Sequence, residues 1–204
     1  MPATAPTSAS LALSADAQDL LFREARTPNT FTDEPVSDEQ IQAIYDLVKY
    51  APTSINSQPM RVLLLRTPQA RERLIPLLME GNRAKTRSAP LTAILAADTE
   101  FHEHLPRLAP YNPGVKDWFA DPAHREHAAR FNATLQVGYF LLGIRAAGLA
   151  AGPMSGFDVD GVDREFFPDG RYRSLVVVNI GIPGPDAWFD RLPRLEHDEV
   201  VSSL

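Results

Sequence analysis

The sequence of 204 residues contains no cysteine, and this absence excludes several kinds of chemistry. A chain without thiols forms no disulfides, offers no thiolate nucleophile and holds neither an iron–sulfur cluster nor a zinc ribbon. Enzyme classes that depend on cysteine are therefore excluded.

The standard nucleotide-binding and hydrolase motifs are also missing. The chain has no GxxxxGK[ST] loop, no GxGxxG after a predicted strand and no GxSxG sequence. The first two motifs cradle phosphates, and the third holds the nucleophile of α/β-hydrolases. P-loop, Rossmann and α/β-hydrolase interpretations therefore lose their usual support.

Positive charge is scarce. The chain has 20 Lys and Arg residues and 26 Asp and Glu residues, which gives a net charge of −6 at pH 7. A surface of this sign repels nucleic-acid phosphates and anionic membranes. We therefore expect neither nucleic acid nor a membrane as a partner.

Long apolar runs are absent as well. The longest stretch, residues 135–149, is interrupted by Gln136 and Arg145, and it is shorter than the roughly 18–20 residues that a membrane span requires. Residues 1–15 contain no basic side chain and no sustained apolar run, so they do not resemble a targeting peptide. We predict a disordered tail over residues 1–15, a single domain over 16–204 and a cytoplasmic location.

Apolar periodicity predicts several helices. One begins after Ser37, which forms a capping box with Gln40. Another begins at Pro68, and Pro76 is expected to kink or break it. The longest helical pattern covers residues 124–147, and its second half is apolar nearly all round, which predicts burial on every side.

Three continuous apolar segments predict buried strands, at residues 61–67, 91–98 and 174–182. Because helical patterns separate them, they favour an α/β or α+β sandwich whose sheet is covered on both faces. Residues 101–122 are aromatic and rich in proline. We expect short helices and loops there, and a role in substrate specificity.

Two close pairs of histidines suggest metal ligands at first sight: His102 with His104, and His124 with His127. Both pairs lie in charged surroundings and lack the HExxH spacing that places ligands and base on one helical face. We interpret them as solvated surface residues, with a metal-dependent hydrolase as the competing hypothesis.

The segment PTSINSQP at residues 52–59 consists almost entirely of hydroxyl, amide and proline side chains. It lies between a predicted helix and a buried strand. Short hydrogen-bonding groups at such a rigid junction suit a polar ring ligand. A helix stop with satisfied turn residues is the alternative.

Asn82 and Lys85 are spaced so that one helical turn places an amide beside an ammonium group. Lysine is rare here, with three residues against 17 arginines. A lysine acts as a compact point charge where charge develops, although an ordinary solvated side chain would give the same pattern.

Two further segments could meet a ligand. Gly152 and Gly156 would let the backbone approach a flat ring, or they could belong to a plain loop. Arg191 and Arg194 near the C-terminus carry the forked donors that phosphate prefers, or they form an ordinary surface pair.

Six segments, taken in order, resemble those of a known family: ARTPNTF, APTSINSQPM, GNRAKTRSAP, GYFLLGIRAAGLAAGPMSGFD, SLVVVNIG and RLPRL. From about Phe22 to its end the chain resembles the FMN-dependent nitroreductases. It looks closest to the branch of the malonic semialdehyde reductase of pyrimidine degradation, through FREARTPNTF, PVSDEQIQAIYDLVKYAPTS, GPMSGFD and RLPRL.

The resemblance implies an α+β, nitroreductase-like fold with a central mixed β-sheet flanked by helices. It also implies a homodimer with a C-terminal extension over the partner, and one FMN in each of two sites at the interface. NAD(P)H would pass a hydride to N5 of FMN, and a small oxidised substrate would then take it. That substrate could be malonic semialdehyde, giving 3-hydroxypropionate, or a nitroaromatic compound or a quinone.

The resemblance assigns Arg26, Thr27 and Asn29 to the FMN phosphate and pyrimidine edge. Ala25 and Asn29 stand where the family has basic residues. Arg191 fits the family's C-terminal phosphate arginine, and Phe189 stands where members often have a lysine. Because of these departures, a flavin-binding protein without a dedicated substrate is the alternative function.

The intact loop motif assigns four residues to the FMN of the partner subunit: Pro52, Thr53, Ser54 and Asn56.

Asn82 and Lys85 match the residues that meet the flavin pyrimidine, and Lys85 would stabilise negative charge at N1 and the C2 carbonyl. The segment whose backbone faces N5 is formed by Pro153, Met154, Ser155 and Gly156. Ser155 stands where some members have a glutamate. The catalytic roles thus fall on Lys85, Ser155 and Gly156, and the sequence decides neither the substrate nor the choice between NADH and NADPH.

Overall fold

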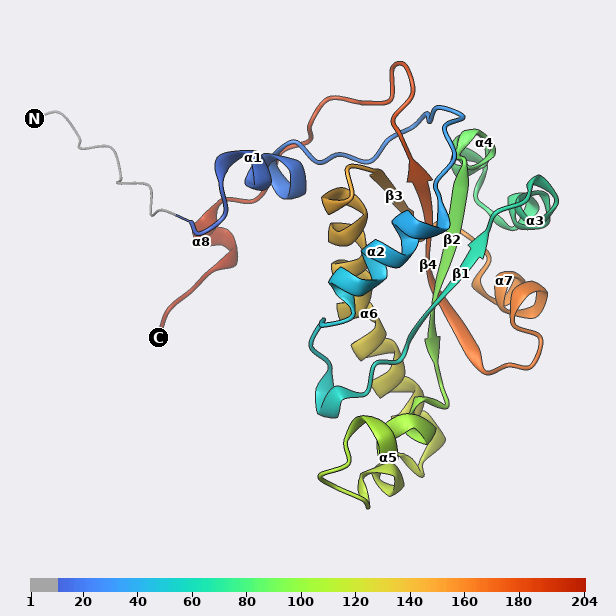
Figure 1. The fold of residues 1–204 in the computed structure, drawn as a ribbon, viewed down its shortest axis with the longest axis vertical. Coiled ribbons are helices and arrows are strands. Elements are labelled where there is room, and N and C mark those ends of the chain that lie inside the picture. The colour runs from blue at the N-terminus through green and yellow to red at the C-terminus, as the bar shows by residue number, and fades with distance from the viewer. Residues whose placement is uncertain (1–10) are drawn as a thin grey trace, which may run out of the picture.

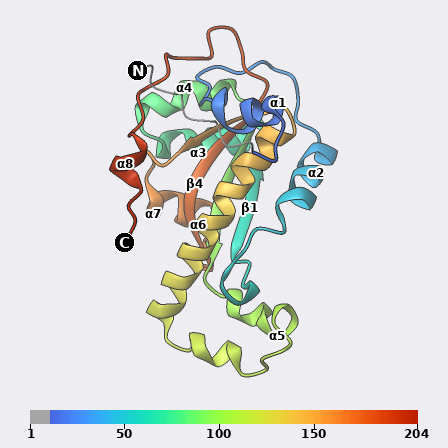
Figure 2. The ribbon, with the colours of Figure 1, turned by 90° about the vertical axis from the view of Figure 1, so that its left-hand side faces the viewer.

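The computed structural model describes residues 11–204. Its centre is one sheet of four strands in the order β1-β2-β4-β3, formed by β1 (Met60–Leu65), β2 (Leu91–Asp98), β3 (Ala150–Met154) and β4 (Tyr172–Gly181). Helices cover both faces of this sheet (Figures 1 and 2). The predicted α+β sandwich is therefore confirmed.

All three strand pairings in the described chain are antiparallel, so the expected mixed sheet is wrong for these residues. Every residue of β2 is buried, a pattern typical of parallel sheets because both of their faces are covered. Here helices cover both faces of an antiparallel sheet and produce the same burial. Burial therefore indicates the layers but not the direction of the strands.

Strand β3 did not emerge as a strand from the sequence pattern because it contains Gly152 and Pro153, two residues that weaken strands. It pairs only with β4 and forms one edge of the sheet. Proline is tolerated at an edge, where fewer backbone donors are needed. The segment that was predicted to approach a flat ring thus begins as a strand.

One face of the sheet is covered by α2 (Asp38–Val48) and α6 (Pro122–Ala146). The predicted capping box is present at α2, where the Ser37 side chain accepts from Gln40 N and the Gln40 side chain accepts from Ser37 N. The two helices approach closely, because a Cβ on Gly143 would collide with Val48. Ile44 and Phe140 fill the core between these helices and the sheet.

The other face carries α3 (Pro68–Leu74), α4 (Glu80–Ser88) and α7 (Val159–Phe166). The predicted break at Pro76 is confirmed, because α3 ends and a short 3-10 turn, Ile75–Leu77, follows. Leu74, Ile94 and Val162 are fully buried in this second layer of the core.

The predicted short helices after residue 100 are present at one end of the sheet. They are α5 (Leu105–Leu108) and two 3-10 helices, Phe101–His104 and Val115–Phe119. Phe101, Leu105 and Val115 are buried together there as a third cluster.

The outer face of α6 carries an apolar stripe formed by Phe131, Leu135 and Tyr139, which are 61%, 44% and 44% exposed. The prediction that the second half of this helix is buried on every side is therefore wrong for a single chain. The stripe has a spacing of four residues, so it lies along one side of the helix.

The chain ends in an arm, residues 183–204, that leaves the sheet and contains α8 (His197–Val200). Together with α1 (Ala15–Gln18) it projects from the body of the molecule (Figure 1). Of the predicted tail at 1–15, residues 1–10 lie outside the described residues. Within residues 11–204, none of the helices combines the length and apolar character needed to cross a membrane.

Candidate functional site

The first group of predicted site residues meets where α4 faces the end of β3. We call this place the α4–β3 corner, formed by Asn82, Lys85, Ser155 and Gly156. The Asn82 side-chain amide donates to the carbonyl of Gly156 at 3.0 Å, and the Met79 N–H donates to the same oxygen at 3.0 Å. Two separate segments predicted from the sequence are thus brought together.

The backbone of the corner leaves two donors free. Pairing with β4 ends at Met154, and in residues 11–204 the N–H groups of Ser155 and Gly156 have no acceptor. Glycine at position 156 lets Asn82 and Met79 pack against the backbone, since a Cβ there would lie 2.9 Å from the Asn82 side-chain nitrogen and 3.0 Å from the Met79 sulfur. The corner can therefore offer adjacent N–H groups to a ligand.

Lys85 lies one turn of α4 after Asn82 and is half-buried. Its ammonium group has no ion-pair partner in the described part of the chain, and burial lowers its pKa. A partly desolvated cation without a counterion favours an anionic ligand, because the ligand would restore the lost solvation.

A buried polar chain fixes α4 to the sheet below the corner. Thr92 Oγ1 donates to Asn179 Oδ1 at 2.9 Å, Asn179 Nδ2 donates to Thr86 Oγ1 at 3.0 Å, and Thr86 Oγ1 donates to the Asn82 carbonyl at 2.9 Å. Thr86, Thr92 and Asn179 are fully buried. Sequence reasoning missed them, although a polar residue inside an apolar strand is a signal that could have found them.

The N-terminal candidates lie against the chain that follows β4. Asn29 donates to the Ala187 carbonyl from its backbone N–H at 2.9 Å and from its side chain at 3.3 Å. The Arg26 guanidinium lies over the Trp188 ring at 5.3 Å, and its buried Nε has no partner in residues 11–204. Thr27 is exposed. Asn29 and Arg26 thus both contact the segment after β4 in their own chain.

Arg145, which was not predicted as a site residue, lies near Arg26. Both line a cavity of about 170 Å³, and the Nε of Arg145 is also buried without a partner in the described chain. Burial lowers the pKa of Arg145. The signal in the sequence was a basic residue inside the apolar stretch of the longest helix.

The second group of predicted residues, Pro52, Thr53, Ser54 and Asn56, lies in a loop at the opposite end of β1 from α4 (Figure 1). Three of the loop's residues have positive φ angles: Ile55 at 50°, Asn56 at 56° and Gln58 at 44°. This conformation is strained for a β-branched residue such as Ile55. A strained, non-glycine loop is typical of functional sites.

Polar side chains outside the loop hold this conformation. Asn132 Oδ1 accepts from Ser54 N at 2.7 Å, and Gln136 Oε1 accepts from Met60 N at 2.9 Å. Both side chains come from α6 and are buried. Within the loop, Thr53 Oγ1 accepts from Gln58 N at 3.2 Å. The 52–59 loop is therefore rigidly held before any ligand binds.

A buried ion cluster supports the same loop. One nitrogen of Arg61 donates to the carbonyls of Gln58 and Met60, both at 2.9 Å, and the other donates to Asp98 at 2.7 Å. Arg171 donates twice to Asp98, at 2.9 Å each. Burial alone raises the pKa of Asp98, but hydrogen bonds from Arg171 and the charge of Arg61 outweigh it and hold the pKa below its usual value. The carboxylate stays ionised and anchors Arg61.

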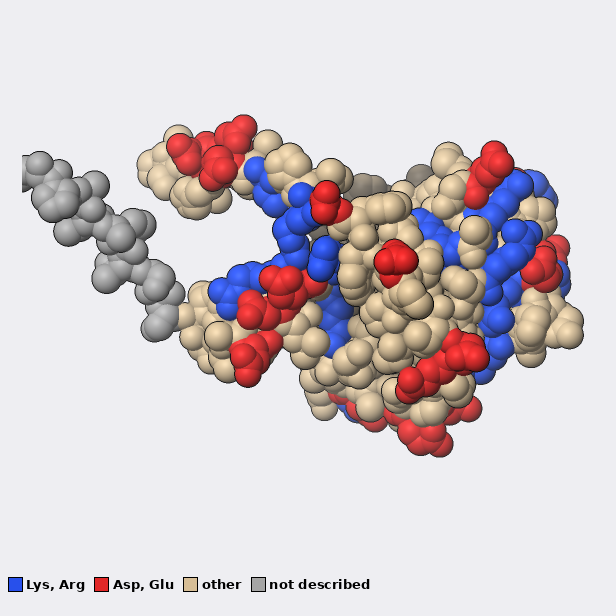
Figure 3. Space-filling view, turned by 90° about the horizontal axis from the view of Figure 1, so that it is seen from above, with Lys and Arg blue, Asp and Glu red and all other residues tan. Residues whose placement is uncertain are grey.

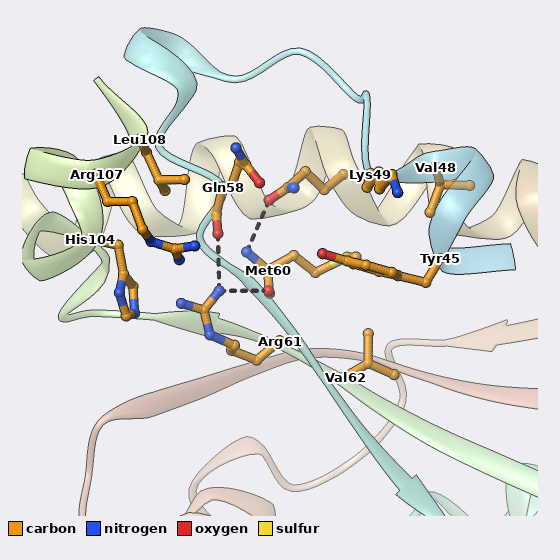
Figure 4. Close-up of a pocket in the computed structure, with 11 residues that line it drawn as sticks. Tyr45, Val48, Lys49, Gln58, Met60, Arg61, Val62, His104, Arg107 and Leu108 are labelled. Carbon is orange, nitrogen blue, oxygen red and sulfur yellow. Dashed lines mark hydrogen bonds between the residues drawn. The ribbon is translucent and has the colours of Figure 1, made fainter. Parts of the chain in front are cut away.

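A cavity of about 380 Å³ opens beside the loop, between α2, the start of β1 and α5 (Figure 4). We call it the α2–α5 cavity. It is lined by Tyr45, Val48, Lys49, Gln58, Met60, Arg61, Val62, His104, Arg107, Leu108 and Gln136. It includes α5, from the region that was expected to shape specificity.

The structure does not bring all predicted residues together in one chain. The 52–59 loop and the α4–β3 corner lie apart, and Arg191 is exposed on the C-terminal arm. Basic side chains gather over α3 and α4 and along the arm that leads to α8 (Figure 3). A single copy of the chain therefore keeps the two groups of predicted residues in separate places.

The interpretation of all four histidines as solvated is wrong for His102, which is 7% exposed. Its two ring nitrogens face different carboxylates, Glu100 at 3.7 Å and Glu103 at 3.6 Å. The two carboxylates also pair with Arg125 and Lys116. His102 thus lies within a cluster of charged side chains.

Residues 22–182 match the family model described as the Nitroreductase family. A candidate NADH dehydrogenase/NAD(P)H nitroreductase of Streptomyces coelicolor is 62% identical over 96% of this chain and 100% of its own. One of Leptothrix cholodnii, with the same description, is 46% identical over 95% and 98%.

Solved structures show the same fold. A candidate nitroreductase from Exiguobacterium sibiricum, crystallised in complex with FMN, has a TM-score of 0.83, with 18% identity over 96% of this chain and all of its own. A nitroreductase family protein from Streptococcus pneumoniae has a TM-score of 0.75, with 22% identity over 90% and 98%.

Proposed function

Because this chain belongs to the nitroreductase family, we propose that it is an FMN-dependent NAD(P)H oxidoreductase that reduces a small oxidised substrate by ping-pong hydride transfer. FMN, when bound, supplies the ring atom N5 that accepts a hydride and passes it on. The observation that carries the proposal is the α4–β3 corner, where the Asn82 amide meets the Gly156 backbone. Within residues 11–204, Lys85 in this corner has no ion-pair partner and the N–H groups of Ser155 and Gly156 have no acceptor.

The donors at the corner fit the flavin edge. Lys85 would hold its charge beside N1 and the C2 carbonyl, where reduction places negative charge. The N–H groups of Ser155 and Gly156 would hold N5 in position for the hydride. Asn82 orients this backbone through its bond to the Gly156 carbonyl. No side chain of the corner needs to act as a general base.

A second copy of the chain would complete the site. The apolar stripe on α6, with Phe131 61% exposed, favours contact with another apolar surface. In such a homodimer the 52–59 loop of one copy would approach the corner of the other. The C-terminal arm, with Leu192 and Leu195 at 74% and 70% exposure, would extend over the partner and bring Arg191 near the FMN phosphate.

For the substrate we propose malonic semialdehyde, with nitroaromatics and quinones as the other candidate acceptors. The aldehyde carbon would take the hydride and its oxygen a proton, giving 3-hydroxypropionate. This finer assignment rests on the resemblance of segments such as FREARTPNTF and GPMSGFD. We also propose a cytoplasmic location, where the NAD(P)H pool is found.

Purified protein tests the proposal directly. We expect flavin absorbance in the isolated dimer, and oxidation of NADH or NADPH that depends on an aldehyde, nitro or quinone acceptor. Flavin bound without turnover of any acceptor would favour the alternative, a flavin-binding protein without a dedicated substrate. Protein that stays colourless and does not bind added FMN would overturn both the oxidoreductase proposal and this alternative.

A further inference from the structure

The α2–α5 cavity has an unusual charge for this chain. Four of its lining residues are basic, namely Lys49, Arg61, His104 and Arg107, and none is an aspartate or glutamate. The chain as a whole has more acidic than basic residues, 26 against 20. A cavity lined by cations in an acidic protein attracts anions selectively.

These cations are not equally available. Lys49 pairs with Asp46 at 2.7 Å, and Arg61 is held by Asp98. Arg107 has no ion pair within residues 11–204, and it is exposed. It can therefore turn its guanidinium toward a ligand, while Arg61 adds a fixed charge.

The cavity also has two chemically distinct ends. Arg61, His104 and Arg107 lie together at one end (Figure 4). Tyr45, Val48 and Val62 lie toward the other, with Lys49, which pairs with Asp46, beside them. A ligand that fills such a space carries an anionic group at one end and an apolar body at the other.

We infer that the α2–α5 cavity binds the carboxylate of an organic acid with an apolar body, and that Arg107 is its main anchor. The inference rests on the proposed function, because this acid would be the oxidised substrate, held beside the loop that approaches the flavin of the partner. A volume of about 380 Å³ lies in the range of ordinary ligand pockets. A three-carbon acid such as malonic semialdehyde would occupy only the charged end, so the inferred class extends from it to larger acids, of the size of a substituted aromatic acid.

A matched pair of acceptors tests the charge. We would compare 4-nitrobenzoate with 4-nitrobenzamide, which have the same ring and nitro group, using the flavin-loaded dimer and a saturating nicotinamide donor. We expect the acid to have a KM about tenfold lower than the amide, since a charge-assisted hydrogen bond is worth about a factor of ten or more. In Arg107→Gln this ratio should fall to about one. In Arg164→Gln, an exposed arginine of α7 outside the cavity, it should stay as in the wild type.

Calorimetry with 4-methylbenzoate, which is not reduced, separates binding from turnover. We expect it to bind wild type and Arg164→Gln, and to bind Arg107→Gln about tenfold more weakly. The inference would be overturned if the enzyme reduces quinones but shows no preference for 4-nitrobenzoate over 4-nitrobenzamide, and if Arg107→Gln binds 4-methylbenzoate as tightly as the wild type. That result would leave the proposed function intact. Absence of flavin and of turnover would overturn the proposed function, while the calorimetry would still decide whether the cavity binds carboxylates. A weaker dimer in Arg107→Gln without carboxylate binding would overturn the inference and assign the cavity to a subunit contact.

Discussion

The α4–β3 corner and the 52–59 loop arrange their polar groups in opposite ways. In the corner, Lys85 and the N–H groups of Ser155 and Gly156 have no partners in the described chain. In the loop the backbone is strained at Ile55 and Gln58, yet side chains from elsewhere satisfy its key groups.

This difference separates two kinds of preparation for a ligand. The corner leaves a half-buried charge and two backbone donors without partners in residues 11–204, so these groups are open to an anionic ligand. The loop keeps its shape through long-range contacts, so binding orders little further chain. The corner supplies charge and hydrogen-bond donors, and the loop supplies a fixed backbone shape.

The largest expected effect comes from the support of the loop. Asp98→Asn should destabilise the protein at pH 7 by about 3 kcal/mol, because it leaves Arg61 and Arg171 without their buried carboxylate. Since the pKa of Asp98 is lowered in the folded protein, its contribution is present above about pH 4 and is lost as the pH falls through the folded pKa. Urea unfolding at pH 7 and at pH 3 checks both the size and the sign. The same loss at both pH values would contradict this role.

Lys85→Ala should weaken FMN binding or flavin reduction about a hundredfold, as expected when a preorganised charge is removed. Without flavin the variant should be no less stable than the wild type, because burial lowers the pKa of Lys85 and its charge opposes folding. Flavin titration and thermal unfolding of the flavin-free protein measure the two effects. Lys116→Ala, which removes an exposed lysine paired with Glu103, is the control. A variant with full flavin content and full activity would remove Lys85 from the mechanism.

The features that could be predicted from the sequence are those formed by residues close together in the chain. Ser37 with Gln40, the break at Pro76 and the spacing of Asn82 and Lys85 all depend on residues within one or two helical turns. Their chemistry is local, so the sequence pattern is enough to place them. The spacing could not reveal that Lys85 has no counterion among residues 11–204.

The features that escaped prediction depend on distant contacts. Ile55 prefers extended or helical backbone, and its positive φ lies beside the bond between Ser54 and Asn132, 78 positions apart in the sequence. The polar chain through Asn179 joins α4 to two strands. No local pattern encodes these pairings. Strand direction likewise depends on how the whole chain packs.

Asn132→Ala should destabilise the protein by about 1 kcal/mol, since it removes the hydrogen bond between the Ser54 N–H and the buried Asn132 side chain. We expect it also to lower the affinity for FMN a few-fold, because the loop loses its fixed shape. Thr134→Ala is a matched control on the same helix, where the hydroxyl donates only to the Arg130 carbonyl on the exposed side. Equal effects of the two substitutions on flavin affinity would show that the loop's shape does not matter for binding.

The smallest effect tests whether corner and loop belong to one site. Asn56→Ala alters the loop, Lys85→Ala alters the corner, and each inactive homodimer would carry the same defect at both sites. When the two variants are unfolded together and refolded, half of the dimers are mixed, and in each of these one site combines a normal corner with a normal loop. Activity should therefore return to about a quarter of the wild-type value, as two-fold symmetry requires.

The matched control mixes Lys85→Ala with Asn82→Ala, two substitutions in the same corner. Here every site of a mixed dimer contains a defective corner, so no activity should return. Recovery in the first mixture and not in the second can arise only if the loop of one copy serves the corner of the other. If neither mixture recovers activity, each chain builds its site alone. The corner and the 52–59 loop would then have to contribute to one site within a single copy, although they lie at opposite ends of β1.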